Sequence, residues 1–377
     1  MIKTQNLDQI KPEIKKILKK ALNGCDEICA EEALELLKVT GKEFFALQNA
    51  ADHICFEKTK NVVTFVVNQN INFTNVCYQK CQFCSFSVPN TEPDAFLLSI
   101  DDIRKKVEKA KSCGCSEVCI QGGINPELQF DYYLNILKIV KDIDSRIHVH
   151  AFSPQEIFYI AKLYGNTVEN TLNELKNAGL DSMPGTAAEI LVDDIRKIVC
   201  PNKISTIQWI EIISTAHKLG IPTTSTIMYG HIEDLKDRVT HLEILRDIQR
   251  KTQGFTEFIP LSFVKEKPVL SRLQEYPLQP SYGMDDLKLF CVARLFFNNF
   301  IDNIQCSWVK LGPKFAQVSL NYGVNDFSGT LMEENISKSA GATFGEYLTP
   351  EEIITIIKNA GKKPAQRDTL YNIIKYY

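Results

Sequence analysis

The sequence has no apolar run that approaches the ~20 residues needed to cross a bilayer, and its first ten residues, MIKTQNLDQI, are polar. We therefore expect neither a membrane-spanning segment nor a secretory signal peptide, and a cytoplasmic location. Positive charge is not in excess either, because 43 Lys and Arg face 46 Asp and Glu for a net charge of −3. A nucleic-acid surface needs a basic excess or stripe, so we expect no nucleic-acid partner.

The sequence also lacks low-complexity segments, and it contains only one local basic run, KPEIKKILKKALNG at residues 11–24. The apolar residues of this run repeat with the period of one helix face, and its lysines occupy the remaining faces. We interpret the lysines as a solvated helix surface and not as a membrane anchor.

Cysteine, in contrast, is plentiful, with twelve residues in the chain. In a cytoplasmic protein these are expected to be reduced thiols and not a disulfide framework. Cys113, Cys115 and Cys119 follow the spacing C-x-C-x3-C, which matches no cluster motif, so we interpret them as ordinary thiols.

Strand-like and helix-like runs alternate through most of the chain. Residues 1 to about 60 carry helix formers without a strand pattern. Eight β-rich runs follow, separated mostly by helical runs, and they cover residues 61–77, 116–123, 146–153, 179–185, 221–230, 255–264, 303–308 and 324–330. This alternation predicts a parallel sheet whose strands are connected by crossover helices.

Eight such units favour an α/β fold of the (βα)8 TIM-like barrel type over an open doubly wound sheet, which stays an alternative. We expect an N-terminal helical extension at residues 1–60, the barrel at 61–330, and a C-terminal helical tail at 331–377 packed on the barrel. Chemistry in such barrels lies at the carboxyl ends of the strands.

Three cysteines, Cys77, Cys81 and Cys84, follow the first predicted strand with the spacing C-x3-C-x2-C. On a helix they would share one face and could be buried apolar residues. A structural zinc site would require a fourth Cys or His, and a disulfide would leave one thiol unpaired. The functional interpretation is an iron–sulfur cluster, because thiolates are its usual ligands.

A [4Fe–4S] cluster normally takes one thiolate for each iron, so three cysteines leave one iron open. An open iron can bind the amine and carboxylate of S-adenosylmethionine, and electron transfer from the cluster can then release a 5′-deoxyadenosyl radical. Phe83, directly before the third cysteine, would pack near the cluster and the adenine. The sequence therefore predicts one cluster with three cysteine ligands and S-adenosylmethionine as cofactors.

The motif with its aromatic residue resembles the radical S-adenosylmethionine (radical SAM) superfamily. Further segments, among them QGGINPELQF, PGTAAEIL, VCPNKIS and the ending QRDTLY, resemble the branch that contains CofH, MqnC and MqnE. The resemblance extends from about residue 45 to the end of the chain, and it is strongest to the CofH family.

The CofH resemblance implies a transferase that cleaves the Cα–Cβ bond of L-tyrosine and transfers its 4-hydroxybenzyl group to 5-amino-6-(D-ribitylamino)uracil, in deazaflavin (FO) biosynthesis. It also implies a low-potential electron donor and, as functional partner, FO synthase subunit 1 (CofG). A menaquinone-pathway radical enzyme acting on a futalosine-type substrate shares the cluster and is the nearest alternative. A non-catalytic iron–sulfur or zinc module is an alternative of another class.

Two groups of residues are candidates for binding the cofactor. Gln121, Gly122 and Gly123 end the second strand. The resemblance implies that their backbone lies close to the methionine amine of the cofactor, whereas a simple glycine turn without a binding role is the alternative. Glu189 and Arg196 would lie two turns apart on one face if residues 187–198 form a helix. A surface ion pair is the alternative, whereas the resemblance implies contacts with the ribose and the carboxylate.

Two histidines in the third strand are candidates for catalysis. The period of a strand puts His148 and His150 on one side, facing the barrel interior, with Ser153 at the strand end. A single buried histidine is more often structural, but two in register indicate a substrate or nucleoside site, and histidine titrates near neutral pH. Tyr229, at the end of the fifth strand, is a further candidate.

Weaker candidates lie at the later strands. They are Glu257, His231, Gln305 and Ser307. The polar side chains of the last two share one side of their strand and suit hydrogen bonds to a uracil ring.

Overall fold

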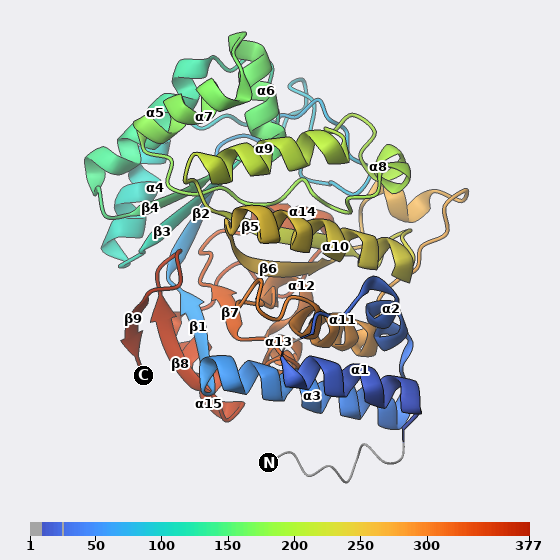
Figure 1. Cartoon of the computed structure of the whole chain (residues 1–377). Coiled ribbons are helices and arrows are strands. Elements are labelled where there is room, and N and C mark those ends of the chain that lie inside the picture. Colours follow the sequence, from blue (N-terminus) through green and yellow to red (C-terminus); the bar gives the residue numbers. More distant parts are fainter. Residues whose placement is uncertain (1–9, 25) are drawn as a thin grey trace.

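Three helices, α1 (Pro12–Asn23), α2 (Ala30–Lys38) and α3 (Gly41–Thr59), precede the first strand in the computed structural model, which describes residues 10–24 and 26–377. Pro12 stands in the first turn of α1, and Gly24 ends the helix in the left-handed conformation with φ 69°. The helices pack beside α10 (Leu235–Thr252) and α11 (Gly283–Phe296), on one flank of the molecule (Figure 1). These helices lie in the segment where the sequence predicted helices before the first strand.

Eight extended segments then lie side by side. They are β1–β2 (Val62–Val66 and Asn68–Asn72, successive parts of one segment), β3 (Glu117–Gln121), β4 (His148–Ala151), residues 182–183, β5 (Thr223–Tyr229), β6 (Phe255–Ser262), residues 304–305 and β7 (Asp326–Gly329). Neighbouring segments pair in parallel from β2 through to β7, and β7 pairs with β1. The hydrogen-bonded path therefore returns to the segment where it began, as in a (βα)8 barrel.

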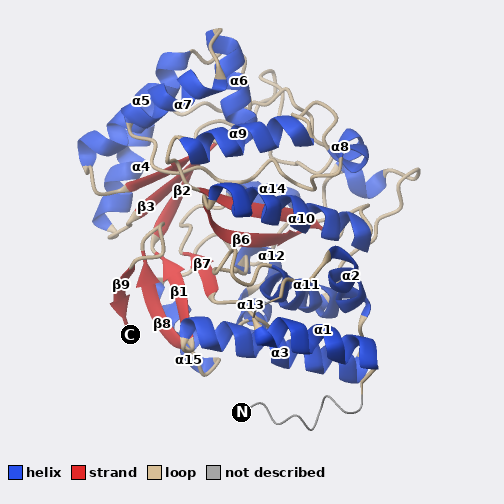
Figure 2. Cartoon of the chain, in the orientation of Figure 1, coloured by secondary structure: helices blue, strands red, loops and turns tan. Residues whose placement is uncertain are grey.

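Helices connect these segments and cover them from outside (Figure 2). In addition to α10 and α11 they are α4 (Ile100–Ser112), α5 (Phe130–Ile143), α6 (Pro154–Tyr164), α7 (Val168–Ala178), α8 (Asp193–Val199), α9 (Thr206–Lys218), α12 (Trp308–Leu311) and α13 (Pro313–Ser319), with a short 3-10 turn, η2 (Val269–Arg272). Helix α7 was not expected from the sequence, although Thr167 caps it by accepting from the Asn170 N–H.

The segment after the barrel contains helices α14 (Asn335–Ala340) and α15 (Pro350–Asn359) and strands β8 (Lys363–Arg367) and β9 (Ile373–Tyr376). Strand β8 pairs in parallel with β1, and β9 pairs antiparallel with β8. The two strands were not expected, because the polar sequence KPAQR has no strand pattern of its own. Its strand conformation depends on the backbone partners that β1 offers.

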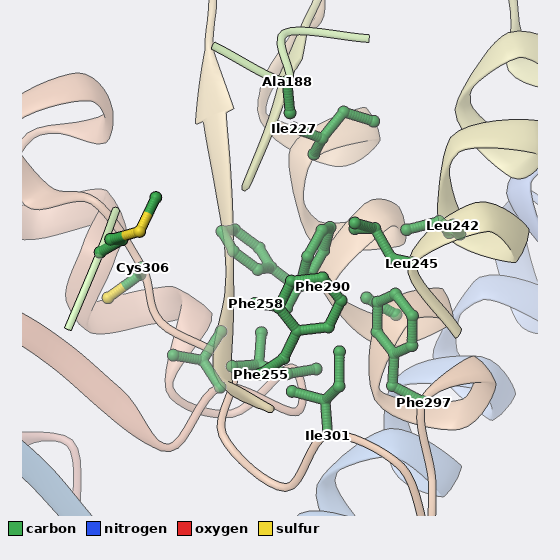
Figure 3. Packing of buried hydrophobic residues seen from close by; sticks show 14 of the residues in the cluster. Ala188, Ile227, Leu242, Leu245, Phe255, Phe258, Phe290, Phe297, Ile301 and Cys306 are labelled. Atoms are coloured by element: carbon green, nitrogen blue, oxygen red, sulfur yellow. The ribbon is translucent and has the colours of Figure 1, made fainter. Parts of the chain in front are cut away.

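The apolar core lies between the barrel wall and the helices. Phe258 of β6 points outward, and its ring centroid is 4.9 Å from that of Phe297, among Leu242, Leu245 and Phe290 (Figure 3). Because successive residues of a strand point to opposite sides, the neighbouring Glu257 faces the barrel interior. The same alternation leaves polar side chains inside the barrel. Within the described part of the chain, no helix combines the length and hydropathy that crossing a bilayer would require.

Candidate functional site

The three clustered cysteines lie on a loop that contains no helix between residues 77 and 86. The alternative in which they form one buried helix face is therefore wrong. The Gln82 N–H donates to the Val199 carbonyl at 2.9 Å, and Asn202 Nδ2 donates to the Gln79 carbonyl at 3.0 Å. The loop is thus held by a segment more than a hundred residues away along the chain.

Two adjoining cavities lie beside this loop and inside the barrel. The first, here called the cysteine cavity, has a volume of about 240 Å³, and its lining includes Cys77, Cys81, Phe83, Cys84, Gln121, Gly122, Gly123, Ser153, Glu156, Glu189 and Lys203. The second, here called the barrel cavity, has about 250 Å³, and its lining includes Asn68, Glu117, His150, Glu257, Gln305, Ser307, Glu334 and Arg367. Gln121, Thr186, Leu261, Lys310 and Ile336 line both, so the cavities meet at these residues.

The cysteine loop packs directly against the end of β3. A Cβ atom on Gly123 would lie 2.2 Å from the Val76 carbonyl oxygen and 3.0 Å from Cys77 Cβ, so a larger residue would push the loop away. Among residues 10–24 and 26–377, no three His, Cys, Asp or Glu side chains converge as they do around a single metal ion. An iron–sulfur cube binds each thiolate at a different iron, and three cysteines that line the same cavity fit that requirement.

The residues at the end of β3 reach the cysteine cavity as predicted. Gln121 Nε2 donates to Thr186 Oγ1 at 2.7 Å, and the Gly122 N–H donates to Glu156 Oε1 at 3.1 Å. These bonds hold the strand end and its glycines beside the cysteine loop. A direct contact with the cofactor stays a prediction for all three residues.

Ser153 also lines the cysteine cavity, and it caps helix α6. Its N–H and its hydroxyl both donate to Glu156 Oε2 at 2.6 Å, in a capping box. Burial raises the pKa of the Glu156 carboxyl to about 7, so this group can exchange a proton near neutral pH. Sequence reasoning missed Glu156, although the pattern Ser-x-x-Glu at residues 153–156 is typical of such a box.

Glu189 lines the cysteine cavity, but its cationic partner is Lys203 and not Arg196. Lys203 Nζ lies 2.5 Å from Glu189 Oε1 and 5.2 Å from the centroid of the Phe83 ring. Both charged groups are almost buried, with side-chain exposures of 14% for Lys203 and 11% for Glu189, so the pair is shielded from water. The structure thus adds a lysine to the predicted site.

Arg196 does not line either cavity. Its guanidinium donates to the backbone carbonyls of Ala187, Ala188, Ile190 and Ile204. The expected helix over residues 187–198 is wrong, because α8 begins at Asp193 and Glu189 has a left-handed φ of 44°. Arg196 therefore stabilises the backbone conformation around Glu189. Because its guanidinium is used by these carbonyls, it does not lie beside the Glu189 carboxylate.

The two histidines of β4 share one side, as predicted, and both contact Ser182. His148 Nε2 and His150 Nδ1 each lie 2.7 Å from Ser182 Oγ. Only His150 lines the barrel cavity. Burial lowers the pKa of His150 to about 4, so its ring is neutral at pH 7 and offers one donor and one acceptor.

The buried neutral ring of His150 predicts a pH effect on stability. The His150 ring takes up a proton near pH 6.5 in the unfolded chain but only near pH 4 in the folded chain. Between these two values the unfolded state binds more protons, so the free energy of unfolding falls as the pH drops from 6.5 to 4. Replacing His150 with Gln should remove about 3 kcal/mol of that pH dependence. Urea unfolding of both proteins between pH 4 and 7 measures it, and parallel curves would contradict the burial argument.

Tyr229 lines neither cavity. Its ring belongs to the apolar core, and the Arg238 guanidinium lies 5.2 Å from its centroid. The neighbouring Met228 lines the cysteine cavity instead. The structure therefore does not bring Tyr229 to the site, because the alternation of β5 turns it outward.

The C-terminal segment contributes to the barrel cavity. Tyr371 Oη and Gln305 Nε2 each donate to Glu257 Oε2 at 2.6 Å. Arg367 donates to both carboxylate oxygens of Asp326, at 2.5 and 3.1 Å. Burial raises the pKa of Glu257 to about 7, against the opposing effect of Arg367, so this carboxyl can take or give a proton at neutral pH.

Sequence reasoning therefore missed several residues of the site. Lys203 and Arg367 lie within the segments VCPNKIS and QRDTLY, which were noted for their resemblance but not examined residue by residue. Lys310, which lines both cavities, had no sequence signal, because only the folding of α12 brings it there.

Comparisons with known proteins agree with this geometry. Residues 71–245 match the radical SAM superfamily, and residues 252–376 match the CofH/MqnC C-terminal region. Among solved structures, the [FeFe]-hydrogenase maturase HydG covers 96% of this chain and 78% of its own at a TM-score of 0.74 and 18% identity. The match to methylornithine synthase (PylB) covers 93% of this chain and 97% of that protein, with a TM-score of 0.74 and 16% identity. At these identities the likeness concerns the fold alone.

Curated relatives are much more similar. The 5-amino-6-(D-ribitylamino)uracil–L-tyrosine 4-hydroxyphenyl transferase of Archaeoglobus fulgidus is 52% identical over 86% of this chain and 92% of its own length. The enzyme of the same name from Methanothermobacter thermautotrophicus is 48% identical over 97% of this chain and 99% of its own length. The chain therefore belongs to the radical SAM superfamily and, within it, to the family of the 5-amino-6-(D-ribitylamino)uracil–L-tyrosine 4-hydroxyphenyl transferases.

Proposed function

We propose that this protein transfers the 4-hydroxybenzyl group of L-tyrosine to 5-amino-6-(D-ribitylamino)uracil; its curated relatives are named as 4-hydroxyphenyl transferases for the same two substrates. The observation that carries the proposal is the identity of about half of all residues over nearly the whole length of both chains. The match includes the C-terminal segment, which lines the barrel cavity through Arg367 and Thr369.

The radical SAM family implies a [4Fe–4S] cluster and S-adenosylmethionine. We assign Cys77, Cys81 and Cys84 as the cluster ligands, with one iron left for S-adenosylmethionine. When bound, the two groups supply a 5′-deoxyadenosyl radical. The remaining residues of the cysteine cavity would orient the cofactor, among them Phe83, the Glu189–Lys203 pair and the two glycines that follow β3.

The barrel cavity suits the two substrates. Its buried polar side chains, among them Asn68, Gln305 and Ser307, can hydrogen-bond to a uracil ring. Glu257 and neutral His150 can hold or move a proton on the bound substrate. Strands of the barrel line this cavity, so they shield a bound radical from part of the solvent.

We further propose a cytoplasmic location, because thiolate ligands require reduced cysteines. A low-potential electron donor and FO synthase subunit 1 would be the functional partners. The division into an extension at residues 1–60, a barrel at 61–330 and a tail at 331–377 is likewise part of the proposal, with β8 of the tail paired to β1 of the barrel.

Anaerobic reconstitution with iron and sulfide tests the function. The reduced protein with S-adenosylmethionine, L-tyrosine and the aminouracil should yield 5′-deoxyadenosine and a tyrosine-derived adduct of the uracil. Turnover of a futalosine-type substrate without this adduct would replace the proposal with the menaquinone branch. Bound iron or zinc without any 5′-deoxyadenosine would indicate a non-catalytic module.

A further inference from the structure

A lysine stands where the two cavities meet. Lys310 lines both the cysteine cavity and the barrel cavity. It belongs to the short helix α12, whose first residue, Trp308, is fully buried. The Trp308 indole N–H donates to the Gly329 carbonyl of β7 at 2.9 Å, which fixes the helix against the barrel. The position of Lys310 is thus set by rigid neighbours.

The other cationic side chains that line the two cavities already have carboxylate partners. Lys203 pairs with Glu189, and Arg367 pairs with Asp326. For Lys310 Nζ, the described residues provide neither an ion pair within 4.0 Å nor a hydrogen bond, although Glu334 lies in the same cavity lining. The Glu334 carboxylate instead accepts from the Ser337 N–H at 2.8 Å, as the cap of α14.

Lys310 is half-buried, and an ammonium that lines a cavity without an anion is costly, because it loses part of its hydration and gains no compensating charge. We propose that Lys310 binds the α-carboxylate of L-tyrosine, an assignment that rests on the proposed function. Tyrosine brings one carboxylate into the cavities, and the junction holds one lysine without a protein carboxylate. Because Lys310 lines both cavities, this assignment places the α-carbon end of tyrosine at their junction.

S-adenosylmethionine also carries an α-carboxylate, but the open iron is its expected partner. Lys310 also lines the barrel cavity, which we propose for the second substrate. The aminouracil has no carboxylate, so Lys310 would select the amino acid and not its acceptor.

The test compares L-tyrosine with tyramine, which keeps the phenol and the amine but lacks the carboxylate. Equilibrium binding to the reconstituted enzyme and KM for each ligand are measured with the wild type, Lys310→Met and Lys310→Arg. Lys310→Met should weaken tyrosine binding about 10- to 100-fold, the usual worth of a charge-assisted hydrogen bond. Tyramine binding should not change, and Lys310→Arg should restore part of the preference for tyrosine.

Lys314→Met is the matched control, because Lys314 is an exposed lysine on the adjacent helix α13. It should leave both ligands unaffected. Equal weakening of tyrosine and tyramine by Lys310→Met would overturn the proposal, as would a loss confined to S-adenosylmethionine binding. If the wild type forms the uracil adduct while Lys310→Met keeps its preference for tyrosine, only this inference fails. If the wild type binds no tyrosine, the proposed function fails as well.

Discussion

Replacing Cys81 with Ala is expected to abolish cluster binding, 5′-deoxyadenosine formation and adduct formation together. Cys81 is 9% exposed and stands in the middle of the cysteine loop. Without its thiolate one iron loses its protein ligand, and a cluster held by two cysteines is not retained. Iron content and 5′-deoxyadenosine are measured on the anaerobically reconstituted variant.

Cys200→Ala is the control for this experiment. Cys200 is also buried and packs in the same small apolar cluster as Cys81, but it does not belong to the loop. Both variants therefore lose a thiol from the same packing environment. Cys200→Ala should keep its iron and its activity. A Cys81→Ala protein that still forms 5′-deoxyadenosine would contradict the ligand assignment.

Replacing Arg367 with Met should lower the free energy of unfolding by about 3–5 kcal/mol, the usual cost of breaking a buried ion pair. Arg367 is 2% exposed and its partner Asp326 is fully buried. The variant leaves the Asp326 carboxylate with two neutral donors, the Thr64 hydroxyl at 2.6 Å and the Ser328 N–H at 2.8 Å, and without a cation. The guanidinium also lies 4.0 Å from the centroid of the Tyr371 ring, so its loss should loosen the C-terminal segment.

Urea or guanidinium unfolding measures this effect, with Arg250→Met as the control. Arg250 pairs with Glu27 and Asp247, but all three side chains are between 42% and 57% exposed. An exposed pair contributes ~1 kcal/mol or less. Similar small losses in both variants would show that the Arg367 pair does not hold the tail to the barrel.

Much of the barrel could be predicted from local sequence patterns. Ser99, for example, is a residue type that favours helix starts, and its hydroxyl oxygen accepts from the Asp102 N–H in α4. Six of the eight predicted extended runs form strands, whereas residues 179–185 and 303–308 contribute only isolated bridges. The six could be recognised because β-rich residues are followed by a turn or a helix start. The alternation inside β4 correctly placed His148 and His150 on one side.

The predictions that failed concern contacts between distant segments. Arg196 and Glu189 were paired by helical spacing, but the chain is not helical at residue 189. The Arg196 guanidinium donates to backbone carbonyls around residues 187–190. Lys203 forms the ion pair with Glu189 that was expected of Arg196. Helical spacing carries no information about such a loop, because its conformation is decided by hydrogen bonds that form only in the folded chain.

The cysteine motif, the alternation of strands and helices, and the family could all be recognised from the sequence, because each depends on residues close together or on direct similarity. The set of side chains that surrounds the two cavities follows instead from the folded barrel. Lys203, Lys310 and Arg367 reach the cavities from three different parts of the chain. The role of each cation depends on whether a carboxylate lies beside it in the folded chain. These ion pairs form only once the barrel and its C-terminal strands have come together.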